Sequence, residues 1–391
     1  MDIRDLTTPC YIIKAEEYRE NIRSFKAAFQ NRWGNKVCFG YSIKTNNFPY
    51  MLKKAAEQGF FAEAVSPDEY EFAVRCGIAE NRILYNGPQK RETVFSACEN
   101  GAVVNLDNLE EVFSVCDRYE NKNVRIRVGL RVNYDIERDC PGECTCEGIP
   151  GRFGISYENG DLKTAIDYMR KKGIKLSGLH LHQSSKTRSL RIYNSITGMA
   201  VRLGREFDLS EIDYIDIGGG YFGGKFFPGK PDVEQYAQTI CENLKKFYDG
   251  QKTTLILEPG AAILATSMDY LTAVLNIRRI RDKRIVTVDG SVIHINPFMH
   301  PHETPFTMID GGRETREEQI VGGSTCMELD RFYPRDLKNR LEKGSRLLFH
   351  CCGAYMSVHN SHFINSAPNI YLLENGEYTL LRQKSIDRMF L

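Results

Sequence analysis

Short apolar segments alternate with helix-like segments along the first two thirds of the chain, and this alternation constrains the fold more than any other feature. Each apolar segment has the length of a buried strand, and several are rich in Val and Ile. Eight alternations before about residue 260 predict a (β/α)8 barrel, for which about 250 residues are typical. The apolar segments are residues 37–43, 60–65, 83–86, 102–106, 124–132, 176–182, 214–217 and 254–257, and the helix-like segments include 49–58, 66–76, 109–119, 161–172, 190–204 and 232–248. Ser66-Pro67-Asp68-Glu69 predicts a helix start with Ser66 as the N-cap.

The pattern changes after Glu258, where predicted strands follow one another without regular helices. These strands span residues 267–280, 284–288, 346–352, 370–374 and 377–382. Asn375-Gly376 between the last two is a strong signal for a β-hairpin. The fold class is therefore α/β, with a barrel over residues 10–265. A mainly β domain of the sandwich or barrel type is expected over residues 266–391, together with residues 1–9.

The overall charge excludes several classes of partner. Lys and Arg number 52 and Asp and Glu number 51, so the net charge is +1 and there is no polyelectrolyte signal for nucleic acid. No apolar run approaches the ~18 residues of a membrane helix, and the first residues lack the order of a signal peptide. We therefore expect a cytoplasmic protein with no nucleic-acid or membrane partner. In that compartment its twelve cysteines are expected to be reduced.

Polar or glycine-rich clusters fall at the carboxyl ends of the predicted strands, the face that carries the active site in such barrels. Lys44 is either a lysine that forms a Schiff base or an ordinary lysine that points away from the rim of the barrel. Strand alternation points the side chains of His180 and His182 in the same direction. One of them could face a ligand, or the two could form a hydrogen-bonded structural pair or a metal site. Gly218-Gly219-Gly220 forms either a phosphate nest or a turn. Glu258 is either the partner of a cationic ring nitrogen or an ordinary rim carboxylate.

Together these clusters match the needs of pyridoxal phosphate: a lysine, a ring-stacking histidine, a phosphate cradle and an acid for a ring nitrogen. With them, the chain resembles the alanine-racemase-fold pyridoxal-phosphate decarboxylases, the group that contains diaminopimelate, ornithine and arginine decarboxylases. The resemblance runs over nearly the whole chain, barrel first and β domain second.

The resemblance implies a role for each matching position in the barrel. Lys44 looks like the lysine that binds pyridoxal 5'-phosphate covalently, and His182 looks like the histidine stacked on the pyridine ring. Gly218, Gly219 and Gly220 look like the phosphate loop. Glu258 looks like the acid that keeps the pyridine nitrogen protonated. Further positions beside the cofactor are implied for Glu63, Arg131 and Ser185.

The β domain carries three further matches. The segment from Gly323 to Asp330 resembles a cysteine loop that reaches into the neighbouring subunit, which implies an obligate homodimer with Cys326 as the acid that reprotonates the α-carbon. The tyrosine of Gly353-Ala354-Tyr355 is implied to contact the phosphate. Asp289, in Asp289-Gly290, resembles a substrate-side aspartate.

The substrate determinants depart from the diaminopimelate enzymes. Ala261 stands where an arginine is usual, and Met327 stands where an acid grips the distal ammonium. Residues 296–300 lack the Arg-Pro of those enzymes. Because unpaired buried charges cost several kcal/mol, we do not expect meso-diaminopimelate as the substrate. Substrate contacts are expected from Asp289, Met327, Glu328 and His300.

Three cysteines close together, Cys140, Cys144 and Cys146, leave several interpretations open. They could line the substrate site, be incidental thiols, or bind a metal with His300 or His302. Their spacing is not a standard zinc pattern, and we predict no metal.

The sequence predicts a pyridoxal-phosphate-dependent carboxy-lyase acting on a small-molecule substrate, either an amino acid or an amino-acid conjugate. Whether the substrate is free or bound to a carrier protein is left open. The alternatives are a racemase on the same fold, which would need a second base on the opposite face, and a non-catalytic relative that binds pyridoxal phosphate.

Overall fold

The computed structural model describes residues 2–145, 148–223, 229–356, 358–359 and 363–389. The chain divides into two compact units. One comprises the chain up to Asn21 and from Ile263 onward, and the other comprises Ile22–Phe222 and Gly229–Ala262. Among the described residues, no helix combines the length and apolar character that crossing a membrane requires.

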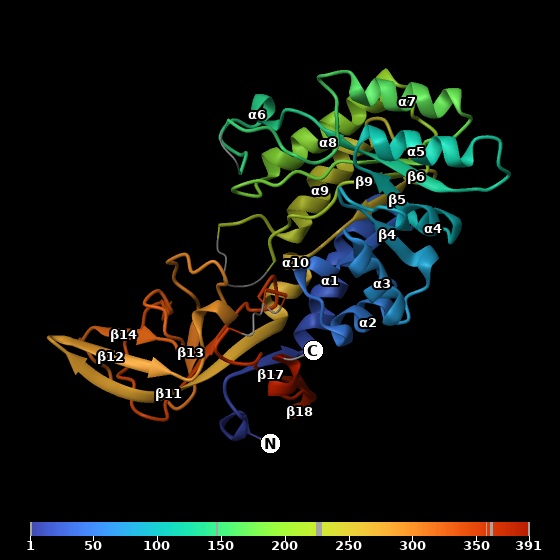
Figure 1. Cartoon of the computed structure of the whole chain (residues 1–391). Coiled ribbons are helices and arrows are strands. Elements are labelled where there is room, and N and C mark those ends of the chain that lie inside the picture. Colours follow the sequence, from blue (N-terminus) through green and yellow to red (C-terminus); the bar gives the residue numbers. More distant parts are fainter. Residues whose placement is uncertain (1, 146–147, 224–228, 357, 360–362, 390–391) are drawn as a thin grey trace. The chain divides into compact units, whose positions relative to one another are not determined.

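The larger unit is the predicted (β/α)8 barrel (Figure 1). Within the described chain, eight strands pair in parallel, and pairing between β5 (Val103–Leu106) and β6 (Arg127–Asn133) closes the ring. A further strand, β7 (Ile155–Ser156), pairs with β6. The eight barrel strands are β2 (Val37–Ser42), β3 (Phe61–Ala64), β4 (Ile83–Tyr85), β5 (Val103–Leu106), β6 (Arg127–Asn133), β8 (Gly178–His180), β9 (Tyr214–Asp216) and β10 (Thr254–Leu257).

Helices lie outside the ring of strands, as Figure 1 shows. The segment predicted at residues 109–119 is a helix over those residues, and the predicted start at Ser66 is confirmed because its side chain accepts from the backbone N–H of Glu69 at 3.2 Å. The helices are α1 (Ala15–Trp33), α2 (Pro49–Glu57), α3 (Pro67–Arg75), α4 (Thr93–Glu99), α5 (Leu109–Tyr119), α6 (Ile136–Asp139), α7 (Asp161–Lys171), α8 (Leu190–Glu206), α9 (Val233–Leu244) and α10 (Ala261–Leu264).

The inside of the barrel consists of an apolar layer below a polar layer. Side chains two residues apart on a strand share a face, so a residue of the apolar layer is followed two positions later by a residue of the polar layer. Leu84, Val103, Tyr214 and Ile256 pack together in the lower layer. Two residues later on the same strands come Asn86, Asn105, Asp216 and Glu258. The other pairs are Gly40 and Ser42, Phe61 and Glu63, Gly129 and Arg131, and Gly178 and His180.

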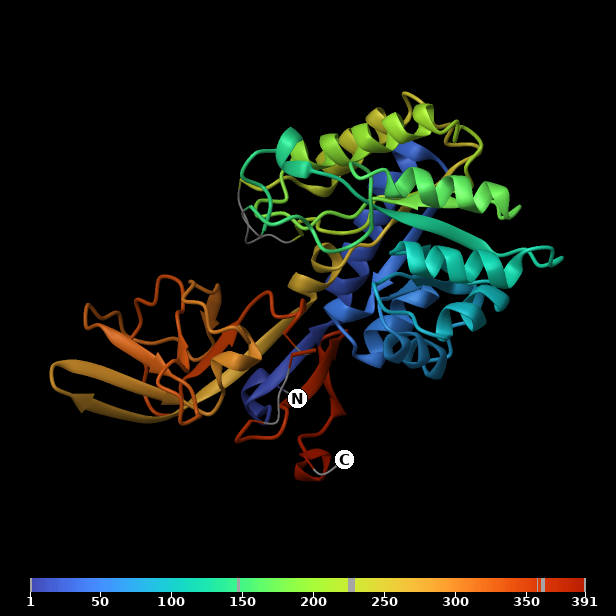
Figure 2. The same cartoon turned by 45° about the horizontal axis from the view of Figure 1, so that its top comes forward.

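The second unit is built on a nine-stranded sheet in which the strand near the N-terminus lies between two late ones. β1 (Cys10–Lys14) pairs antiparallel with β11 (Met268–Ile280) and parallel with β17 (Asn369–Glu374). These backbone pairs attach residues 10–14 to the sheet, and the division into compact units places residues 10–21 in this unit, whereas the sequence-based boundary assigned them to the barrel. β11 and β12 (Lys283–Val288) form a long ribbon, yellow to orange in Figure 2.

The predicted hairpin is confirmed: Asn375 and Gly376 both have positive φ, and they join β17 to β18 (Glu377–Arg382). The φ values of 51° and 79° suit the two-residue turn that matches strand twist. The remaining strands of the sheet are β13 (Phe306–Met308), β14 (Gln319–Gly322), β15 (Arg331–Phe332) and β16 (Arg346–Phe349).

The lower layer predicts a specific steric requirement at Gly178. A Cβ there would lie 2.1 Å from the Tyr214 ring. We therefore expect Gly178→Val to destabilise the barrel by about 3 kcal/mol. Fluorescence of Trp33, the only tryptophan of the chain, reports barrel unfolding in denaturant because its indole donates to the Thr253 carbonyl.

The matched control is Gly198→Ala in helix α8. A Cβ at Gly198 meets nothing within 4 Å, and the backbone is helical. We expect this variant to stabilise the protein by up to about 1 kcal/mol, because glycine is unfavourable in a helix interior. An unchanged midpoint for Gly178→Val would contradict the steric argument.

Candidate active site

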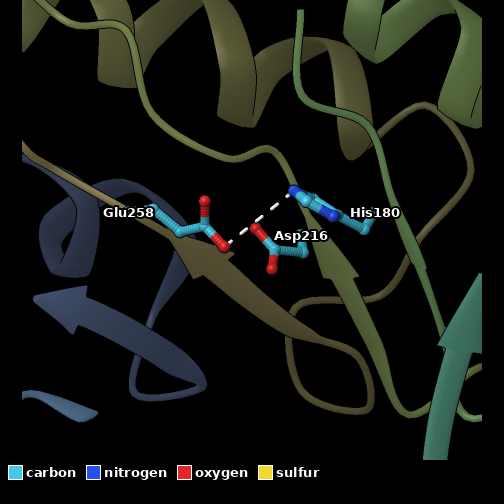
Figure 3. A group of neighbouring side chains, drawn as sticks. All are labelled: His180, Asp216 and Glu258. Carbon is cyan, nitrogen blue, oxygen red and sulfur yellow. Dashed lines mark ion pairs between the residues drawn. The ribbon is translucent and has the colours of Figure 1, made fainter. Parts of the chain in front are cut away.

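Three polar-layer residues, His180, Asp216 and Glu258, face one another at the carboxyl ends of β8, β9 and β10 (Figure 3). All three are buried, and their potential ligand atoms lie within 4.8 Å of one another. Nε2 of His180 is 3.9 Å from Oε1 of Glu258. Neither ring nitrogen of His180 has a hydrogen-bond partner within the described part of the chain.

Burial governs the charge state of these groups. Burial, then Asp216 and then Glu63, raises the pKa of the Glu258 carboxyl well above its ordinary value. The pKa of Asp216 is also raised by burial. Since two neighbouring acids share one dry site, the pair favours holding a proton between them. Burial and the nearby Arg131 lower the pKa of His180 well below its ordinary value, so the imidazole is neutral.

Lys44 lies on the one-turn helix Ile43–Thr45 directly after β2, where the sequence placed it. Its Nζ forms an ion pair with Oε2 of Glu63, which also accepts from the hydroxyl of Ser42 at 2.8 Å. Glu63 is fully buried, whereas the Lys44 side chain is 37% exposed. The amine is therefore held by a fixed carboxylate and is still accessible to a ligand.

Two asparagines that sequence reasoning did not single out connect the acids. Asn86 donates to Glu63 at 3.2 Å and to Glu258 at 2.5 Å, and its own oxygen accepts from Asn105 at 2.8 Å. No motif marks them. The sequence pattern that could have identified them is the alternation of side chains along β4 and β5, because each asparagine stands two positions after an apolar residue that faces the barrel interior.

His182 and the glycine run are packed together. The backbone N–H of Gly219 donates to Nδ1 of His182 at 3.0 Å, and that of Gly218 donates to Asp216 at 2.9 Å. A Cβ at Gly218 would lie 2.4 Å from Nδ1 of His182, so only glycine allows this approach. Burial lowers the pKa of His182 to about 3, which leaves a neutral ring. Phosphate binding by the run stays a prediction.

Arg131 and Ser185 lie at two other predicted positions. The Arg131 guanidinium is 3.4 Å from Asp107 and lies over the Phe153 ring, and its Nε has no partner among the described residues. The Ser185 hydroxyl accepts from the backbone N–H of Arg188 at 3.2 Å. Arg131 thus has donor capacity left for an anionic ligand.

The remaining predicted residues lie in the second unit. The Asp289 carboxylate accepts from the side chains of Thr272 and Thr8 and from the Ala273 backbone, so it holds segments of its own unit together. The Glu328 side chain is 95% exposed and pairs with Arg331. Cys326, His300 and Tyr355 are exposed and Met327 is partly buried. Their contacts with substrate or cofactor stay predictions.

Of the three clustered cysteines, Cys146 lies outside the described residues. Cys140 is buried with Sγ 3.4 Å from the Arg191 carbonyl, and Cys144 forms a backbone bridge with Ser185. The loop is thus attached to the segment after β8 that carries Ser185. Its role in substrate binding stays a prediction.

The barrel residues fit pyridoxal phosphate by their chemistry. The accessible amine of Lys44 suits the aldehyde of the cofactor, the buried acid of Glu258 suits its ring nitrogen, and the neutral ring of His182 suits its aromatic face. Nε of Arg131 is a buried donor without a partner among the described residues. His180, Asp216 and Glu258 also form a donor set of the kind that holds a divalent cation. The Lys44 amine next to this set favours the organic cofactor, because a nearby ammonium opposes a metal ion.

Comparison with known proteins agrees with this chemistry. Residues 16–265 match the family "Pyridoxal-dependent decarboxylase, pyridoxal binding domain". A probable chloroplastic diaminopimelate decarboxylase of Oryza sativa subsp. japonica is 25% identical over 94% of this chain and 75% of that protein. The L-glutamyl-(BtrI acyl-carrier protein) decarboxylase of Niallia circulans is 26% identical over 96% of this chain and 91% of that protein.

Among solved structures, a diaminopimelate decarboxylase from M. jannaschi has the same fold. The TM-score is 0.86 at 22% identity, covering 97% of this chain and 90% of that one. Family, fold and relatives are in agreement on a carboxy-lyase, in preference to the racemase and the non-catalytic alternatives. The chain belongs to the pyridoxal-dependent decarboxylase family and is a pyridoxal-phosphate-dependent amino-acid decarboxylase.

Proposed function

We propose that the substrate is an α-amino acid, or an amino-acid conjugate, other than meso-diaminopimelate. The observation that carries this proposal is the lack of charge at two positions. Ala261, the first residue of α10, stands where the diaminopimelate enzymes have an arginine, and Met327 stands where they have an acid. A substrate with charged groups at both ends would leave charge unpaired at these places, at a cost of several kcal/mol.

A carrier-bound substrate is the form that we favour for an experimental test. One of the relatives is named as a decarboxylase of a glutamyl group on an acyl-carrier protein. When an amino acid is joined to a carrier through its distal carboxylate, that end bears no free charge. Neutral residues at positions 261 and 327 suit such a substrate better than arginine or an acid would.

The residues of the barrel would hold the cofactor and prepare the reaction. Bound pyridoxal phosphate supplies an electron sink for the electrons left when the α-carboxylate departs as carbon dioxide. Lys44 would bind the cofactor, and Glu63, in contact with Nζ, can take the proton that the amine must lose. Glu258 would accept from the pyridine nitrogen, and His182 would cover one ring face.

We further propose a homodimer in which Cys326 of one subunit supplies the final proton to the α-carbon in the site of the other. The thiol is exposed, and large apolar side chains of the same unit, among them Leu329 and Phe363, are exposed as well. The Ser324 hydroxyl accepts from Asn365 at 3.4 Å, which ties the cysteine loop to the segment that bears Phe363. Covering this surface with a second copy would remove apolar area from water.

Lys44→Ala is expected to abolish decarboxylation and the visible absorbance of lysine-bound cofactor. The matched control is Lys54→Ala on helix α2, whose ammonium pairs with Glu57 on the surface and should be dispensable. Absorbance spectra and carbon dioxide release measure both effects. A visible band that persists in Lys44→Ala would contradict the assignment.

A panel of free L-, D- and meso-amino acids and one glutamyl-loaded carrier protein tests the substrate proposal. We expect carbon dioxide release from an amino acid whose distal end does not carry both an ammonium and a carboxylate group. Release from meso-diaminopimelate should be slow at most. Product masses identify the reaction. Rapid turnover of meso-diaminopimelate would show that Ala261 and Met327 do not exclude it.

Mixing two inactive variants tests the shared site. Lys44→Ala and Cys326→Ala each inactivate every site of their own homodimer, but a mixed dimer has one site with both residues intact. Activity should therefore return when the two variants are mixed and allowed to exchange subunits. No recovery, in spite of subunit exchange seen by mass spectrometry, would argue against a shared site.

A further inference from the structure

The carboxamide of Asn86 lies between two buried carboxylates. Its Nδ2 is 3.2 Å from Oε1 of Glu63 and 2.5 Å from Oε1 of Glu258. All three side chains are buried inside the barrel. The two hydrogens of a single NH2 group therefore serve two different acids.

The orientation of this amide is set by a chain of donors below it. The Tyr214 hydroxyl donates to Oδ1 of Asn105 at 2.7 Å, which leaves the Asn105 NH2 group to donate to Oδ1 of Asn86 at 2.8 Å. The oxygen of Asn86 is thus used as an acceptor, and its NH2 group must face the acids. Reversing the amide would place its oxygen against both carboxylates and its NH2 against another NH2.

The bridge opposes the effect of burial on Glu258. Burial, Asp216 and Glu63 all favour the protonated acid, whereas a donated hydrogen bond and the positive charge of Lys44 favour the ionised one. The ionisable groups that interact with Glu258 from the surrounding elements include Lys44, Glu63, Arg131, His180, Asp216, Cys38 and Tyr221.

We propose that Asn86 is a positioning residue that aims Glu258 at the cofactor nitrogen and favours its ionised form there, and that holds Glu63 in place as the partner of Lys44. The inference rests on the proposed function, because it assigns Glu258 to the ring nitrogen. Only an ionised acceptor keeps that nitrogen protonated, and a protonated ring is the strong electron sink.

A neutral donor is the side chain that this position requires. An aspartate would add a third negative charge against Glu63 and Glu258. A lysine or arginine would form an ion pair with Glu258 and so compete with the ring nitrogen for the carboxylate. Asparagine satisfies both acids while leaving their charges available.

The test compares N86L and N86D with the wild-type holoenzyme. Both replacements keep the approximate shape of asparagine, and both remove the NH2 donor. The matched control is N243L, because the Asn243 amide also donates to two oxygens, those of Asn194 and Thr197, but on the outer helices.

Pyridoxal phosphate labelled with 15N in the ring reports protonation of the nitrogen by its chemical shift. Cofactor affinity, kcat and KM, and unfolding followed by Trp33 fluorescence complete the set.

In N86L we expect the ring nitrogen to move toward the chemical shift of unprotonated pyridine. Cofactor affinity should fall by about 10- to 100-fold, the range that a hydrogen bond to a charged group carries. We expect kcat to fall by a similar factor and KM to change less. N243L should match the wild type in chemical shift and kcat.

N86D adds a dependence on pH with a defined sign. At high pH the new carboxylate repels Glu63 and Glu258, so its defect should equal or exceed that of N86L. As pH falls the new carboxyl gains a proton, and its O–H can again donate to Glu258. The defect of N86D relative to the wild type should therefore shrink at low pH, whereas that of N86L should not.

A ring nitrogen that stays protonated in both variants would overturn the proposal, even if they unfold more easily, and would leave Asn86 a structural bridge. Failure of the proposed function looks different. In that case the wild type itself would show no bound cofactor signal or no release of carbon dioxide.

Discussion

Burial of the polar layer inside the barrel governs both the fold and the candidate site, because its acids are closed off from water and must take their hydrogen bonds from other groups of the protein. Glu63, Asp216 and Glu258 are three acids within a single ring of strands. An unpaired buried charge is very costly, and each of these acids accordingly has a hydrogen-bond donor. Asn86 serves Glu63 and Glu258, and Asp216 accepts from the Gly218 backbone two residues further on and from Asn105 on β5.

The apolar layer below is part of the same arrangement. Tyr214 fills the barrel where Gly129 and Gly178 leave room for its ring, and its hydroxyl begins the donor chain through Asn105. Packing and electrostatics are therefore coupled, because the side chain that fills the lower layer also sets the direction of the amides above it. The buried polar atoms left without a partner among the described residues include both nitrogens of His180 and Nε of Arg131, and both residues belong to the candidate site.

Much of the fold and part of the site could be predicted from local pattern. The helix at residues 109–119, the cap at Ser66 and the turn at Asn375-Gly376 follow from short-range chemistry, and each is confirmed. Lys44 and Glu258 were identified because parallel strands end at one face, so residues far apart in sequence come together there. The strand near the N-terminus was not predicted, since its partners β11 and β17 lie more than 250 residues away.

The barrel, the second β domain and pyridoxal phosphate as the cofactor could be predicted from the amino-acid sequence. Periodicity, turn residues and a few polar residues at strand ends are local signals that can be recognised without knowledge of contacts. The hydrogen bonds that satisfy the acids could not be predicted in this way and are seen in the folded chain. The tertiary structure revealed Asn86 and Asn105 as connecting residues, and it showed that the N–H groups of Gly218 and Gly219 already bind Asp216 and His182. A hydrogen-bond partner depends on closure of the ring, because only the closed ring brings the Asn86 side chain after β4 within hydrogen-bond distance of Glu63 on β3 and of Glu258 after β10.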